Sequence, residues 1–151
     1  MRVVLDTNIL VRAASIRNRG PAFEVLKILL EPEHVLCSSP FMLDELIRVL
    51  RYPRLRSVHR LTEYEMDAFV LAIQKASLMV SLSSEVEFAI VPNDPKDDPI
   101  VQTAVLGKAS VICTLDRHLY APEVLRYCSE RDISILSDVE LLERLRPQSS
   151  S

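Results

Sequence analysis

Short apolar runs alternate along this chain with longer segments in which apolar residues recur every three or four positions. The short runs are typical of buried strands, and the three-to-four-residue spacing is typical of helices that pack on one face. The predicted strands span residues 2–6, 34–38, 78–82, 110–115 and 133–136. The predicted helices span residues 8–15, 21–30, 40–50, 62–76, 97–106, 122–131 and 139–145.

Turn and capping residues support several of these boundaries. Ser39 and Thr62 stand where helix N-caps are expected, and Glu65 follows Thr62 at the spacing of a capping box. Gly107 stands where the helix over residues 97–106 ends. The strands are apolar throughout and alternate with helices, a pattern typical of a parallel sheet covered on both faces. We therefore expect an α/β fold, a three-layer α/β/α sandwich around a mostly parallel sheet.

The length and composition are those of one soluble domain. The chain has 151 residues, of which 48% are hydrophobic and 26% charged. We expect a single domain over residues 1–146 and a disordered tail over 147–151. We predict neither a membrane span nor a signal peptide. The odd number of cysteines, with no CxxC pair, indicates reduced core thiols. Together these features predict a cytoplasmic protein without a membrane partner.

Glycine is scarce, which excludes two kinds of nucleotide site. The chain contains only Gly20 and Gly107. A P-loop and a GxGxxG dinucleotide loop both need several glycines where the backbone approaches phosphate. Cofactors bound by such loops are therefore excluded.

Acidic residues follow two of the predicted strands. Asp6 closes the first strand and Asp116 closes the fourth. A carboxylate beside buried segments is costly unless a partner offsets its charge. Ligands of parallel α/β sheets bind outside the carboxyl ends of the strands. If these two strands are neighbours in the sheet, the two carboxylates are neighbours as well.

A further cluster of acids precedes the helix over residues 97–106. Asp94 and Asp98 are well explained as caps or first-turn acids of this helix. Asp97 is less well explained, because a helix that already includes it places it beside Ile100 and Val101 on an apolar side. In the helix over residues 40–50 spacing alone does not choose between Asp44 and Glu45, both of which are also explained as solvated charges or as partners of Arg48.

Four acids thus fall at inward positions or at strand ends, with no histidine or cysteine cluster beside them. Oxygen ligands alone favour Mg²⁺ or Mn²⁺ over zinc. Separate pairing of each acid with an arginine is the alternative, but it is uncommon for so many acids at once. We therefore predict a divalent-metal site formed by Asp6, Asp97 and Asp116 together with Glu45 or its neighbour Asp44.

Three segments resemble the PIN-domain nucleases, and in particular the toxin components of bacterial and archaeal toxin–antitoxin systems. These segments are LDTNIL, SSPFMLDELIRVL and DPKDDPIVQTAVLGKASVICTLDRHL, and the likeness covers roughly residues 1–142. The resemblance implies an α/β/α sandwich that cleaves single-stranded RNA with Mg²⁺ or Mn²⁺. It also implies an antitoxin partner and a homodimer.

Residue by residue, the resemblance agrees with the acids found above and selects Glu45 over Asp44. The family's four acids fall on Asp6, Glu45, Asp97 and Asp116, and its polar support near the metal falls on Asn8 and Thr114. Leu115 and His118 depart from the pattern of this branch, in which glycine and aspartate are frequent. A second metal that used the missing acid would be weakened, with Asp98 or Asp94 as the candidate replacement.

The net charge of −3 gives no general sign of nucleic-acid binding, but residues 46–62 contain no acid and several arginines. In a nuclease this stretch would follow the RNA backbone. The alternative is a solvated, flexible connection. The candidate RNA-binding residues are Arg48, Arg51, Arg54 and Arg56.

Two other functions remain open at the level of sequence. A PIN module that binds RNA or protein but has little catalytic activity is kept open by Leu115 and His118. A structure-specific DNA nuclease ranks lower, because those enzymes carry extra acids and helical insertions that a chain of 151 residues lacks.

Overall fold

A computed structural model of the protein describes residues 1–15, 19–82, 95 and 98–146. Its strands form one five-stranded sheet in the order β3-β2-β1-β4-β5, and every neighbouring pair is parallel. The strands are β1 (Arg2–Leu5), β2 (Val35–Ser38), β3 (Ser77–Met79), β4 (Val111–Cys113) and β5 (Ser134–Leu136). The order places β1 at the centre, directly beside β4.

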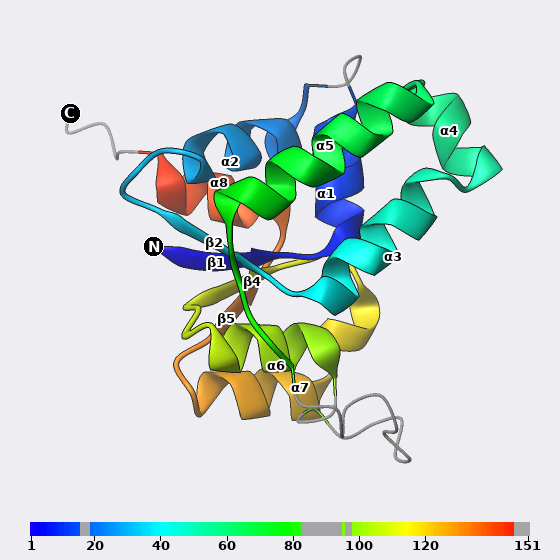
Figure 1. The fold of residues 1–151 in the computed structure, drawn as a ribbon. Helices are drawn as coiled ribbons and strands as arrows, with labels where there is room; N and C mark the ends of the chain where they lie inside the picture. The colour runs from blue at the N-terminus through cyan, green and yellow to red at the C-terminus, as the bar shows by residue number, and fades with distance from the viewer. Residues whose placement is uncertain (16–18, 83–94, 96–97, 147–151) are drawn as a thin grey trace.

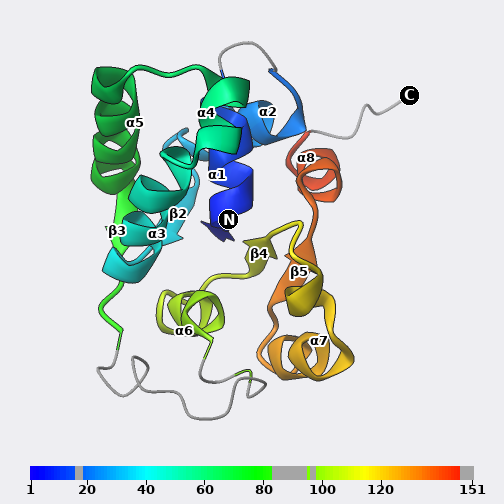
Figure 2. The ribbon, with the colours of Figure 1, turned by 90° about the vertical axis from the view of Figure 1, so that its right-hand side faces the viewer.

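Helices cover both faces of this sheet (Figures 1 and 2). On one side lie α1 (Thr7–Ala14), α2 (Pro21–Leu29), α3 (Pro40–Leu50), α4 (Pro53–His59), α5 (Glu63–Ala76) and α8 (Asp138–Leu145). On the other side lie α6 (Pro99–Leu106) and α7 (Pro122–Ser129), and the 3₁₀ turn η3 (Arg117–Tyr120) connects β4 to α7. The predicted three-layer α/β/α sandwich with a parallel sheet is confirmed.

Alternate residues of the central strand β1 pack in two separate hydrophobic cores, because successive side chains of a strand point to opposite faces. Val3 and Leu5 of β1 pack in the larger core with α1, α2, α3, α5 and α8. Val4 packs in the smaller core with residues of α6 and α7. The central strand is therefore buried on both faces, which explains why its sequence is apolar throughout.

The caps predicted from the sequence form as expected. The Ser39 side chain accepts from the Met42 N–H at the start of α3, and Thr62 and Glu65 form a capping box at the start of α5. Some element ends differ from the predictions. β3 ends at Met79, earlier than predicted, and α6 begins at Pro99 because Asp98 is its N-cap.

The segment between α3 and α5 is helical, so the flexible connection considered from the sequence is wrong there. α4 is held by His59, which is almost fully buried. The ring Nε2 donates to the Leu50 carbonyl at 2.7 Å, and Nδ1 accepts from the Leu61 N–H at 3.0 Å. These two bonds tie the end of α4 to the end of α3 and to the chain that enters α5.

Two smaller expectations concern cysteines and membranes. Cys37, Cys113 and Cys128 are buried free thiols, as predicted. Within the described residues no helix is both long and apolar enough to cross a membrane. The predicted tail over residues 147–151 lies outside the described part of the chain.

Candidate active site

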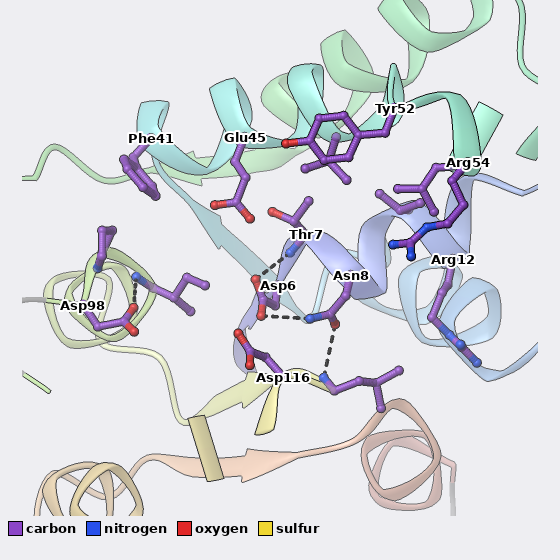
Figure 3. Close-up of a pocket in the computed structure, with 16 residues that line it drawn as sticks. Asp6, Thr7, Asn8, Arg12, Phe41, Glu45, Tyr52, Arg54, Asp98 and Asp116 are labelled. Carbon is purple, nitrogen blue, oxygen red and sulfur yellow. Dashed lines mark hydrogen bonds between the residues drawn. The ribbon is translucent and has the colours of Figure 1, made fainter. Parts of the chain in front are cut away.

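A cavity of about 590 Å³ opens at the carboxyl ends of β1 and β4. Its walls come from the start of α1, from α3 and α4, from the start of α6 and from the turn after β4. Asp6, Glu45 and Asp116 line it together, and Figure 3 shows their carboxylates directed into one space. Asp6 directly follows β1, and Asp116 comes three residues after β4 as the N-cap of η3. The two acids are brought together because these strands are neighbours in the sheet.

Asp6 is the most constrained of the three acids. It is 3% exposed and is the N-cap of α1, where its Oδ1 accepts from the Thr7 N–H at 2.7 Å. Its Oδ2 accepts from the Thr114 hydroxyl at 2.7 Å and from the Asn8 side-chain amide at 3.1 Å. A helix N-terminus favours a negative charge, so this position suits a carboxylate.

The surroundings nevertheless favour the protonated form of Asp6. Burial, and to a smaller extent the negative charges of Glu45 and Asp116, raise the pKa of Asp6 from 3.8 to about 6. The hydrogen bonds from Thr114 and Thr7 oppose this shift without cancelling it. Within the described part of the chain, no positive charge is among the causes that set the pKa of Asp6.

Glu45 and its neighbour Asp44 point in different directions from α3. Glu45 is half-buried and lines the cavity, whereas Asp44 is exposed and lies outside its lining. In Figure 3 the Glu45 carboxylate extends from α3 toward Asp6. This geometry agrees with the choice of Glu45 that the resemblance implied.

Asn8 and Thr114 link the two strand-end acids. The Thr114 hydroxyl donates to Asp6 and accepts from the Asp116 N–H at 3.0 Å. The Asn8 side chain donates to Asp6 and accepts from the Leu115 N–H at 3.2 Å (Figure 3). These contacts fix the orientation of the Asp6 carboxylate and the course of the chain after β4.

The remaining candidate acids divide into two groups. Asp98 lines the cavity, but its Oδ1 caps α6 by accepting from the Ile100 N–H at 2.9 Å. Its Oδ2 lies 3.6 Å from Nε2 of His118. The capping role considered for Asp98 is therefore confirmed. Asp94 and Asp97 lie outside the described residues.

The candidate RNA-binding arginines do not form one surface. Arg54 lines the cavity, and Arg48 is exposed on α3 outside the lining. Arg51 pairs with Glu63 and Asp67 of α5 at 3.1 and 2.7 Å. Arg56 pairs with Glu63 at 3.3 Å. Two of the four arginines thus join α5 to the segment before it, and Arg54 is the one that reaches the cavity.

Sequence reasoning missed three other residues that line the cavity. Arg12 enters the wall from α1, and its Nε lies 3.7 Å from Oδ2 of the buried Asp138. Phe41 and Tyr52 reach the rim from α3 and from the start of α4. One signal for Arg12 was its helical spacing from Asn8, four residues earlier on the same helix.

The carboxylate oxygens that line the cavity are chemically suited to bind a divalent cation. Every carboxylate here offers oxygen, the ligand that Mg²⁺ and Mn²⁺ prefer, and the raised pKa of Asp6 marks an uncompensated negative charge. Among the described residues no group of three acidic, histidine or cysteine side chains is close enough to hold a metal ion as it stands. Since Mg²⁺ is usually bound by one or two carboxylates with several waters, such a group is not required.

Comparison with known proteins places this geometry in a family. The sequence profile described as the PIN domain matches residues 2–118, a range that contains Asp6, Glu45 and Asp116. The fold is similar to a chain in the crystal structure of VapBC2 from Rickettsia felis bound to a DNA fragment from their promoter. That match has a TM-score of 0.53 and 14% identity, and covers 91% of this chain and 98% of the other. No curated protein matches the chain. The chain belongs to the PIN domain family.

Proposed function

We propose that this protein is a divalent-metal-dependent endoribonuclease that cleaves single-stranded RNA. PIN domains are generally metal-dependent nucleases. The observation that carries the proposal is the buried Asp6 carboxylate, which faces Glu45 and Asp116 in an open cavity and has a raised pKa. Carboxylates held close together without a cation repel one another, and a divalent ion removes that repulsion.

In this proposal Asp6, Glu45 and Asp116 hold Mg²⁺ or Mn²⁺ together with Asp97. Asp6 is the central ligand, because it lies at the end of the middle strand between the other two described acids. The bound ion supplies activation of water for attack on a phosphodiester and offsets negative charge in the transition state.

The chain's other residues orient these acids. Thr114 and Asn8 hold one oxygen of Asp6, and the Thr7 N–H holds the other. Hydrogen bonds of this kind to a carboxylate set the direction in which it points and its basicity toward a metal. Arg54, which also lines the cavity, contributes positive charge for the RNA backbone.

We further propose that the protein is the toxin of a toxin–antitoxin pair. The similar Rickettsia felis structure is a VapBC2 complex, which supports an antitoxin partner for this chain as well. Such a partner would place a side chain, for example arginine, among the cavity acids, beside the buried Asp6, whose raised pKa disfavours its ionised form. The proposal includes a cytoplasmic location and a homodimer.

Cleavage of a labelled single-stranded RNA in Mn²⁺, Mg²⁺ or EDTA tests the proposal. We expect cleavage in either metal, none in EDTA, and none for Asp6→Asn or Glu45→Gln. Asp44→Asn is the matched control, because Asp44 is the exposed neighbour of Glu45 on the same helix. Its activity should equal that of the parent protein. Cleavage by Asp6→Asn at the parent rate would contradict the assignment.

One observation favours a second candidate, a PIN module that binds RNA or protein without efficient turnover. His118 lies against Asp98 at 3.6 Å, and Asp98 already caps α6, so this side of the cavity offers less free negative charge. RNA binding that needs no metal, with no cleavage under any condition, would support this candidate.

A further inference from the structure

The rim of the cavity carries two exposed aromatic side chains. Phe41 is 46% exposed and Tyr52 is 45% exposed, and both belong to the lining. Among the aromatic residues that the structure describes, the one other exposed ring is Tyr64 on α5, which is 82% exposed and lies outside the lining. Two of the three exposed rings in the described chain are therefore gathered at one site.

These two rings stand on either side of Glu45. Phe41 precedes Glu45 by four residues, about one helical turn of α3, and so lies on the same face of the helix. Tyr52 comes after the end of α3, where the chain turns into α4. Figure 3 shows the Glu45 carboxylate between the two rings, with both rings at the upper border of the cavity.

The combination of chemistries at this site points to one class of ligand. Water-exposed aromatic surface is unfavourable in a free protein, and an exposed apolar patch often marks a binding site. Here the rings border carboxylates suited to a cation and share the cavity lining with Arg54. A ligand that matches all three features carries a negative phosphate beside a flat, stackable group, as a nucleotide does.

We propose that Phe41 and Tyr52 are stacking platforms for unpaired nucleobases on either side of the phosphate that lies among Asp6, Glu45 and Asp116. The inference rests on the proposed function and extends it to the basis of substrate choice. A base stacked on a side chain must be released from its own helix, so the rings select single strands over duplexes.

Equilibrium binding of a short single-stranded RNA in EDTA tests the rings without cleavage. The acids repel phosphate in EDTA, but they do so equally in every variant that keeps them. We expect Phe41→Ala and Tyr52→Ala each to raise the Kd about tenfold, the usual scale for loss of one stacked base. Tyr52→Phe keeps the ring and should bind like the parent protein. Tyr64→Ala, the matched control, should also leave the Kd unchanged.

Two further measurements separate stacking from a structural role. An RNA with an abasic site at the stacked position should lose the same affinity as Phe41→Ala, and combining the two changes should cost nothing more. The chain contains no tryptophan, so Phe41→Trp introduces a single tryptophan whose fluorescence can be excited apart from that of the tyrosines. Its emission should be quenched by single-stranded RNA and unaffected by a duplex of the same sequence.

The possible failures are distinguishable. If the parent protein binds and cleaves RNA while Phe41→Ala and Tyr52→Ala bind within twofold of it, the stacking inference is wrong and the proposed function stands. If Phe41→Ala and Tyr52→Ala reduce the affinity for single-stranded and duplex RNA equally, the stacking inference is wrong as well. If the aromatic variants lose affinity only for a protein partner, the rings belong to a protein interface. If the parent protein neither binds nor cleaves RNA, the proposed function fails and the inference fails with it.

Discussion

At the scale of single residues, the site depends on the cost of keeping a charge in a buried position. Asp6 caps α1 and accepts three hydrogen bonds, yet burial and two neighbouring carboxylates still raise its pKa to about 6. The apolar packing around β1 thus holds Asp6 where its negative charge is unfavourable. A bound cation would remove that cost. Stability is given up at this residue, a pattern frequent at functional sites.

This cost predicts how stability depends on pH in the absence of metal. The unfolded chain releases the Asp6 proton near pH 3.8, whereas the folded chain keeps it until about pH 6. Between these values the folded state binds the extra proton, so this contribution to stability falls as the pH rises and is gone above pH 6. A difference of about two pKa units corresponds to roughly 3 kcal/mol.

Asp6→Asn removes the titrating group and should therefore stabilise the protein at neutral pH. In EDTA at pH 7 we expect its free energy of unfolding to exceed that of the parent protein by up to about 3 kcal/mol. The advantage should shrink toward zero near pH 4, where the parent carboxyl is protonated. Urea unfolding at both pH values measures this difference. Equal stabilities at pH 7 would show that Asp6 carries no such cost.

At the scale of elements, α4 turns an arginine-rich stretch into a wall of the cavity. His59 bonds to the Leu50 carbonyl and the Leu61 N–H and so fixes where this helix lies. Arg51 and Arg56 pair with acids of α5 and serve as supports, whereas Arg54 lies in the cavity lining. The arginines of this short segment thus differ in role: two pair with acids of α5, and one faces the cavity.

The salt dependence of RNA binding should distinguish an arginine that contacts RNA phosphate from one that only pairs with α5. Arg54→Ala removes a phosphate contact, so the slope of log K against log salt should fall by about 0.7 for a single strand. Arg51→Ala is the matched control on the same segment, and its slope should equal that of the parent protein. Its stability should fall slightly instead, because exposed ion pairs contribute little. A reversed result, with the slope changed only in Arg51→Ala, would move the RNA path to α5.

At the scale of the whole molecule, the order of the strands assembles the site. β1 is central and β4 is its neighbour, so acids that are 110 positions apart in sequence meet at one edge of the sheet. α3 and α6 then close the cavity from the two opposite faces, linked by a 3.1 Å hydrogen bond from Thr103 to Ser39. The cavity is therefore a product of topology rather than of any single motif.

Much of this architecture was predictable from the sequence, because buried parallel strands and capped amphipathic helices leave local patterns. Ser39 and Thr62 show this for the helix starts. Asp6 and Asp116 were predictable because each follows an apolar run at a strand end.

Other features were not predictable, because they depend on long-range packing. Helix periodicity could not separate Glu45 from Asp44, since the choice depends on which face meets the sheet edge. α4 has only seven residues and is held by the buried His59, a tertiary contact without a local signal. In the sequence Phe41 and Tyr52 are two separate aromatic residues with no shared pattern. Only the folded structure brings them to the rim of one cavity.

The most direct test of the central claim is Mn²⁺ binding to the purified protein, measured from the electron paramagnetic resonance signal of free Mn²⁺. We predict a saturable site in the parent protein and in Asp44→Asn. The affinity should fall at least tenfold in Asp6→Asn, and it should fall in Glu45→Gln and Asp116→Asn as well. Mn²⁺ binding of parent strength in Asp6→Asn would contradict the assignment of this cavity as the metal site.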